Sequence, residues 1–354
     1  MTPQSVIHGD TAVLQLIEDF RQQTQVPQEV ILDTEHRSKL AEMARSIYLG
    51  LQTPLETTFH SLFSINMTMP IRVGIDMGLF STLASSDGPM TAAQLSKATG
   101  GEELLVVRLM RAICVQNFAV EVDLKTYHSN NVTRFVGGPL GEAAYGIFYE
   151  PAVKPKSNLS EAISFFQRNG YKSPESAYDG IYQRANDCIG LSTWDHWKGS
   201  EEYSRFNFAM AAASTMTPSP WEWMKSEGIT DNESIRSTNE VFVVDVGGGR
   251  GTHMKKLLKR FPSIRGRVVN QDLAEVIEEM DPDNLDARVE QSKHNFFEPQ
   301  PIKGAAIYYL SSIMHDWPDK EAVKILVHLR DAMSSTSKIW INDLILPDRG
   351  STYR

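Results

Sequence analysis

The sequence predicts a mixed α/β fold in which a parallel sheet, covered by helices on both faces, follows an N-terminal all-α region. Three observations support this fold class. From residue 241 onward, short apolar runs alternate with helical patterns, which is typical of a parallel sheet. The first of these runs ends in a cluster of glycines. Residues 11–50 repeat apolar side chains with helical spacing.

Composition limits the classes of function. The chain has 354 residues, enough for two or three domains, and a net charge of −9 at pH 7. This balance argues against nucleic-acid binding, which needs clustered Lys and Arg. The two cysteines, Cys114 and Cys188, lack the spacing of a zinc or disulfide framework, so we expect no metal. We see neither a run long enough to span a bilayer nor a signal peptide, which favours a cytoplasmic protein.

Residues 1–135 are expected to form a helical and winged-helix-like domain. Two amphipathic helices are predicted within residues 11–50. A helix is predicted to lead from Pro70 through residues 79–80. Thr91 and Gln94 form a capping box that opens the next helix, and a third helix starts at residues 102–103. Residues 118–122 and the stretch around 127–128 are predicted to be the two wing strands.

Residues 136–236 are expected to be a helical linker that contributes a substrate pocket. Helical patterns lie near residues 178–185 and 206–215. Aromatic side chains are frequent here and include Trp194 and Phe206. Pockets for small molecules are mostly apolar, which favours this segment as pocket wall, although ordinary core packing is the alternative for most of these residues.

Residues 237–354 are expected to form a Rossmann-like domain. The predicted strands cover residues 241–246, 267–272, 305–310 and 337–346, and the predicted helices cover 252–260, 273–280 and 319–333. Ligands of such open parallel sheets bind at the carboxyl ends of the strands.

The glycine cluster is the strongest indication of a ligand. Asp245 is followed by Gly247, Gly248 and Gly249, directly before a predicted helix, so a ligand can approach the backbone closely. A dinucleotide fingerprint would need glycine where Thr252 stands. Because a carboxylate at the strand end favours a ligand with an ammonium group, we predict S-adenosylmethionine as the cofactor. A tight turn without a ligand is the alternative.

Asp272 ends the second predicted strand, where an acid can accept hydrogen bonds from both ribose hydroxyls. The alternative is that Asp272 only caps the following helix.

His315 is the candidate general base. It follows the third predicted strand, on the ligand-facing edge, and histidine titrates near neutrality. Asp343, near the end of the neighbouring strand, could orient the imidazole, or it could simply face water. Full proton transfer from a phenol, with a pKa of about 10, to an imidazole of about 6.5 costs roughly 5 kcal/mol. Attack on a sulfonium cation offsets that cost without a metal.

Several motifs resemble the fungal and plant-type, caffeate-type class I O-methyltransferases, which act on small molecules of secondary metabolism. The matching segments are Arg72 with Gly78-Leu79-Phe80, Leu104 with Arg108-Leu109-Met110-Arg111, the glycine cluster, Gln271-Asp272-Leu273, His315-Asp316-Trp317-Pro318-Asp319, and Leu346-Pro347-Asp348.

The resemblance implies a homodimer built by the N-terminal region and a methyl transfer from S-adenosylmethionine to a hydroxyl of an aromatic or polyketide-type molecule. It implies a cofactor site at Asp245, the glycines, Asp272, Leu273 and Phe296, with Asn295 at the adenine and Trp317 packed near the cofactor. It also implies a catalytic pair, His315 and Asp343, and a place for Met210 near the transferred methyl group.

The chain departs from the family pattern at three places. The acid expected before residues 296–297 is Asn295, whose side-chain oxygen can still meet an adenine amino group. Ser311 stands where the family often has Arg or Lys. The family pattern continues beyond the strand that ends near Leu346, so on this resemblance the C-terminal end is missing.

Two other functions are open at this point. One is a methyltransferase-fold enzyme that binds S-adenosylmethionine but catalyses a pericyclic or dehydration step. The other is a truncated, inactive paralogue that only dimerises. Product mass separates methyl transfer from rearrangement, and a thermal-shift response to the cofactor separates both enzymes from the inactive form.

Overall fold

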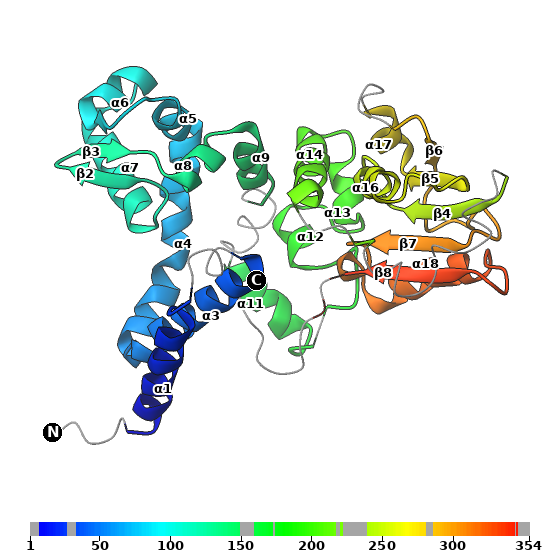
Figure 1. Cartoon of the computed structure of the whole chain (residues 1–354), viewed down its shortest axis with the longest axis horizontal. Helices are drawn as coiled ribbons and strands as arrows, with labels where there is room; N and C mark the ends of the chain where they lie inside the picture. The colour runs from blue at the N-terminus through cyan, green and yellow to red at the C-terminus, as the bar shows by residue number, and fades with distance from the viewer. Residues whose placement is uncertain are drawn as a thin grey trace. The chain divides into compact units, whose positions relative to one another are not determined.

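The computed structural model describes residues 7–26, 33–148, 159–172, 174–216, 220–221, 239–280, 286–343 and 345 (Figure 1). The chain divides into two compact units, one formed by the N-terminal residues up to Ile71 and one by Arg72–Ile345. No helix in the described ranges is both long and apolar enough to cross a membrane.

The first unit contains α1 (Ile7–Gln23), α3 (Thr34–Leu51) and most of α4 (Pro54–Asp76). Helices α1 and α3 pack together, and Val13 on α1 and Leu40 on α3 are buried, which confirms the two predicted amphipathic helices. The prediction for Pro70 is wrong. Pro70 lies inside α4, which continues to Asp76. Gly78, with a φ of +74°, then changes the direction of the backbone before α5 (Leu79–Ala84) begins.

The winged-helix module of the second unit agrees with the prediction. Its helices are α6 (Ala92–Thr99), α7 (Glu103–Val115) and α8 (Asn131–Val136). Thr91 and Gln94 make the complete capping box of α6. The short strands β1 (Met90–Thr91), β3 (Thr126–His128) and β2 (Val120–Asp123) form an antiparallel sheet in that order.

In the described residues, five further helices lie between this module and the main sheet along the chain. They are α9 (Pro139–Phe148), α11 (Leu159–Arg168), α12 (Ile181–Ala185), α13 (Thr193–Trp197) and α14 (Glu201–Met216). Helices α12 and α14 correspond to the two helical patterns predicted in this segment. Within the predicted helical linker, residues 149–158, 173, 217–219 and 222–236 lie outside the described residues.

The main sheet is parallel, with strand order β6-β5-β4-β7-β8. Its strands are β4 (Val241–Val246), β5 (Arg267–Asp272), β6 (Val289–Lys293), β7 (Ile307–Ser311) and β8 (Lys338–Asn342). The helices between them are α16 (Thr252–Arg260), α17 (Ala274–Glu278) and α18 (Asp319–Arg330). The predicted Rossmann-like sheet is confirmed, but strand β6 was not predicted.

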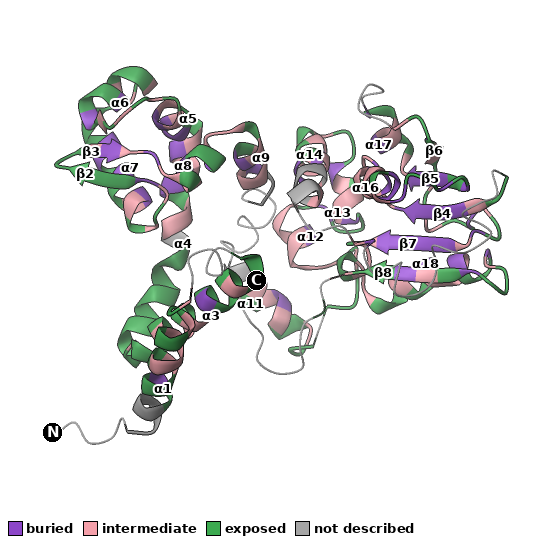
Figure 2. Cartoon of the chain, viewed as in Figure 1, coloured by how far each residue is buried: buried purple, intermediate pink, exposed green. Residues whose placement is uncertain are grey.

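Both faces of the sheet are covered, so its central strands are apolar at consecutive positions. Val243 packs toward α16 with Met254, whereas its neighbour Val244 packs toward α18 with Ile325. Figure 2 shows the resulting buried strands β4 and β7 in purple. Because both faces of the sheet are packed, the ends of the strands and the residues that follow them are held in fixed positions.

Candidate cofactor and active site

Because the five strands are parallel, their carboxyl ends meet at one edge of the sheet. The predicted site residues follow these ends. Gly247 follows β4, Asp272 ends β5, Asn295 follows β6, His315 follows β7 and Asp343 follows β8. The structure therefore brings the predicted cofactor and catalytic residues to the same edge.

The glycine turn after β4 has a backbone that other residues do not readily adopt. Gly247, Gly249 and Gly251 have φ values of +72°, +55° and +68°. The amides of Gly247 and Gly248 donate to the carbonyl oxygen of Gln271, at 2.9 and 3.0 Å. A Cβ at Gly249 would meet nothing within 4 Å, so this side of the turn is open to a ligand.

Asp272 is tied to the turn from β5. One carboxylate oxygen accepts the amide of Gly249 at 2.8 Å, and the other accepts the amide of Leu273 at 2.7 Å. Burial raises the pKa of Asp272 to about 6, although these two amides favour the carboxylate. Each oxygen keeps a lone pair, so an ionised Asp272 can accept two more hydrogen bonds, as ribose hydroxyls would require.

Asp245 lies beneath the turn and is completely buried. Neither of its carboxyl oxygens has a hydrogen-bond partner among the described residues. Burial, together with the charge of Asp272, raises the pKa of Asp245 to about 8. The predicted contact between Asp245 and an ammonium group stays a prediction.

An apolar wall stands beside the turn. A Cβ on Gly247 would lie 2.7 Å from Cδ1 of Ile313 and 3.4 Å from Cε1 of Phe296, so only glycine fits there. Phe296 and Phe297 both pack edge-on against Trp317, with ring centroids 6.0 and 4.6 Å away. The side-chain oxygen of Asn295 accepts the amide of Phe297 at 3.0 Å and retains a second lone pair.

His315 lies in the 3-10 helix Met314–Asp316 and is held by Asp343. One oxygen of Asp343 accepts the amide of Met314 at 3.0 Å, and the other forms a short hydrogen bond with Nδ1 of His315. Partial burial acts to lower the pKa of His315, but this bond and the charges of Asp316 and Asp343 raise it above the usual value. The His315 side chain is 51% exposed, so a substrate can reach its ring.

Comparison with known proteins identifies the family. The O-methyltransferase domain model matches residues 176–354, and the O-methyltransferase dimerisation domain matches residues 59–135. A relative, O-methyltransferase ucdC of Aspergillus ustus, is 32% identical over 322 residues, covering 90% of this chain and 81% of its own length. The chain belongs to the O-methyltransferase family.

Other members agree with this assignment. The demethylsterigmatocystin 6-O-methyltransferase of Aspergillus parasiticus is 30% identical over 80% of this chain and 71% of its own length. The solved structure of OxaC with S-adenosylhomocysteine (SAH) and oxaline has a TM-score of 0.79 and 25% identity, covering 97% of this chain and 86% of OxaC. A structure described as a pericyclic reaction enzyme has a TM-score of 0.81 and 25% identity, covering 97% and 85%.

These findings confirm the predicted fold class, the O-methyltransferase activity, the secondary-metabolite setting and S-adenosylmethionine as the cofactor. They do not test the individual site residues, the base or the substrate, which stay predictions.

The O-methyltransferase domain places the predicted substrate residues in an aromatic cluster. Trp194 and Phe206 contact each other with centroids 5.0 Å apart, and both pack against the buried cluster of Trp197, Tyr203 and Val276. Met210 lies one turn further along α14 and is half-buried. Leu273, directly after Asp272, packs against the same buried cluster, so the aromatic segment adjoins the cofactor edge.

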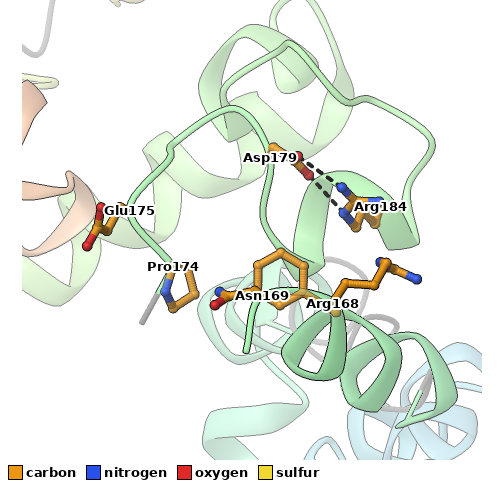
Figure 3. Close-up of a pocket in the computed structure, with 7 residues that line it drawn as sticks. Arg168, Asn169, Pro174, Glu175, Asp179 and Arg184 are labelled. Carbon is orange, nitrogen blue, oxygen red and sulfur yellow. Dashed lines mark hydrogen bonds and ion pairs between the residues drawn. The ribbon is translucent and has the colours of Figure 1, made fainter. Parts of the chain in front are cut away.

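A separate cavity of about 330 Å³ lies between α11 and α12 (Figure 3). Its lining is mostly polar and includes Asn169, Glu175 and the ion pair of Arg184 with Asp179, whose Nη2–Oδ2 hydrogen bond is 2.9 Å long. Such a lining differs from the apolar pocket expected for an aromatic substrate.

The sequence did not predict a polar network that lies next to the predicted catalytic pair. The Ser311 hydroxyl contacts Nε2 of His253 at 3.2 Å and accepts the Asn342 amide at 3.0 Å. Asn342 also donates to the Tyr309 hydroxyl at 3.0 Å. This network connects the ends of β7 and β8 with α16. Polar residues at the ends of apolar strands were its only signal in the sequence.

Proposed function

We propose that this O-methyltransferase transfers the methyl group of S-adenosylmethionine to a hydroxyl of an aromatic or polyketide-type secondary metabolite, with His315 as the general base. The observation that carries the proposal is that Asp343 makes two hydrogen bonds, one with the Met314 amide and one with Nδ1 of His315. Because Nδ1 is occupied by Asp343, the lone pair of the neutral ring lies on Nε2, in a side chain that is half-exposed.

The geometry fits the cofactor. Residues proposed to hold it are Gly247, Gly248, Gly249, Asp272, Leu273, Asn295, Phe296 and Trp317, with Asp245 buried beneath the glycine turn. The open side of Gly249 offers space, Asp272 offers acceptors for ribose hydroxyls, and the aromatic rings beside Gly247 offer an apolar surface for a base. Bound S-adenosylmethionine supplies a methyl group on a positively charged sulfur.

The protein's own part is to position the acceptor and take its proton. Nε2 of His315 accepts the hydroxyl proton as the oxygen attacks. Asp343 stabilises the resulting imidazolium and keeps the ring from turning. The raised pKa of His315 narrows the gap to a phenol, so proton transfer costs less than it would to an ordinary imidazole. Trp194, Phe206 and Met210 are proposed to line the substrate pocket.

We also propose a division into an N-terminal dimerisation domain at residues 1–135, a helical linker and pocket region at 136–236, and the methyltransferase domain at 237–354. The match of the dimerisation model to residues 59–135 supports a homodimer built by the first of these.

A direct test is incubation with S-adenosylmethionine and a panel of phenolic polyketides, read by mass spectrometry. His315→Gln should lower the rate of methylation by about 10²–10⁴-fold, the usual contribution of a general base. His128→Gln, in β3 of the winged-helix module, is the matched control and should keep the wild-type rate. An unchanged rate in His315→Gln would refute the assigned base.

A pericyclic or dehydration reaction is the second candidate, supported by the 25% identical structure described as a pericyclic reaction enzyme. It predicts a product without an added methyl group and no S-adenosylhomocysteine, both of which the same mass-spectrometric assay measures.

A further inference from the structure

In the described part of the chain, three buried acceptor atoms beneath the glycine turn have no hydrogen-bond donor. They are the two carboxyl oxygens of Asp245 and the side-chain oxygen of Asn270, and neither residue is exposed to solvent. A buried acceptor without a donor costs free energy, and an isolated buried carboxylate costs more. A proton bound to one of these oxygens would supply the missing hydrogen-bond donor.

The Asp245 and Asn270 side chains approach the same point. A Cβ placed on Gly248 would lie 2.1 Å from the side-chain oxygen of Asn270 and 2.6 Å from Oδ2 of Asp245. The two side chains extend from neighbouring strands, where Asp245 is the direct register partner of Asn270. The carboxyl and the amide oxygen therefore share one small volume under the turn.

The orientation of the Asn270 amide is fixed by its other contacts. Its nitrogen donates to the carbonyl oxygen of Gly249 at 3.0 Å and to Oε1 of Gln291 at 2.9 Å. Turning the amide over would place its oxygen against these two acceptors, so the oxygen has to face Asp245.

Among the described residues, no cation acts on the pKa of Asp245. On β5 the charged group that acts on it is Asp272, which has the same sign. On β7 its register partner is Tyr309, and on α16 the ring packed against Tyr309 is His253, which burial holds neutral by lowering its pKa to about 4. The nearest turn amides, those of Gly247 and Gly248, already donate to Gln271.

We propose that Asp245 is a neutral carboxylic acid at physiological pH and donates its proton as a hydrogen bond to the side-chain oxygen of Asn270. The bond holds the Asn270 amide against Gly249 and so sets the shape of the turn that receives the cofactor. Asp245 is then a positioning residue, and its carboxyl group does not pair with the ammonium group of the methyl donor. Burial and the charge of Asp272 act in the same direction, since both raise the pKa of Asp245.

The inference rests on the proposed cofactor site only for its functional consequence, so protonation and binding are measured separately. Protonation is read by infrared spectroscopy of the full chain without cofactor. We expect a C=O stretch of a protonated carboxyl at pH 7.5, where acids with a pKa of about 6 are ionised. The band should disappear above about pH 9 and be absent from Asp245→Asn. Absence of the band in the wild type at pH 7.5 would overturn the proposal even if no variant folds.

Binding is read by calorimetry with S-adenosylmethionine. Asp245→Ala removes the donor and should weaken affinity at least tenfold. Asp245→Asn replaces the acid by an amide that can donate to the same oxygen, and should restore affinity to within about threefold of the wild type. A folded Asp245→Asn protein that binds as poorly as Asp245→Ala would show that an ionised carboxylate meets the ligand. A protein with the infrared band but no cofactor affinity would contradict the site assignment and leave the protonation intact.

Discussion

Substitution of Gly248 by alanine tests how tightly the turn is packed. The new Cβ would lie 2.1 Å from the side-chain oxygen of Asn270, so that oxygen has to retreat by about 0.9 Å to reach even a tight contact of 3.0 Å. The movement pulls the Asn270 amide away from Gly249 and Gln291. Overpacking costs about 1–3 kcal/mol and each of two lost hydrogen bonds about 0.5–1.5 kcal/mol, which together give about 2–6 kcal/mol.

Gly249→Ala is the matched control, because the same methyl group would meet nothing within 4 Å. Its cost comes from the backbone, whose φ of +55° disfavours a side chain by roughly 1–2 kcal/mol. The methyl group projects into the open side of the turn, so it should weaken S-adenosylmethionine binding more than it weakens the fold.

Urea unfolding of both variants, followed by circular dichroism, measures the two free energies of unfolding, and calorimetry measures cofactor affinity. We expect Gly248→Ala to lose more stability than Gly249→Ala. If Gly249→Ala unfolds at the lower urea concentration, the packing argument for the turn is wrong.

Three further variants test separate parts of the structure. Asp343→Asn removes the carboxylate that raises the pKa of His315, so the acidic limb of the pH profile of kcat/KM should move to lower pH. The rate should fall about 10–100-fold. A shift of the limb to higher pH would contradict the assignment of Asp343 as the partner of His315. Gln300→Ala removes the two hydrogen bonds between the buried side chains of Gln271 and Gln300, at 2.8 and 3.0 Å, and leaves the Gln271 amide with Ser292 alone, at 3.5 Å. It should cost about 1–3 kcal/mol in urea unfolding, and a loss near zero would refute this role. Thr91→Ala breaks the capping box of α6 and should lower the free energy of unfolding by about 0.5–2 kcal/mol. Its S-adenosylmethionine affinity should stay unchanged, and a weaker affinity would show that the effect is not confined to α6.

Local patterns in the sequence determined the central part of the sheet. Strands β4 and β5 and helix α16 begin and end where the apolar runs and glycines predicted, because strands covered on both faces carry mostly apolar side chains at consecutive positions. Strand β6 was missed because it lies at the edge of the sheet order, where partial exposure permits the polar sequence Val-Glu-Gln-Ser-Lys.

The site divides in the same way. The sequence by itself determined which residues follow the strand ends, and the parallel fold then guaranteed that the glycine turn, Asp272 and His315 share an edge. Only the tertiary structure decided what the buried polar groups do. The hydrogen bond between Asp343 and His315 depends on the register of strands and on distances of a few ångströms. The same is true of the approach of the Asp245 carboxyl to the side-chain oxygen of Asn270. Hydrogen bonds between groups far apart in the chain leave no periodic pattern in a single sequence, whereas burial of apolar surface does.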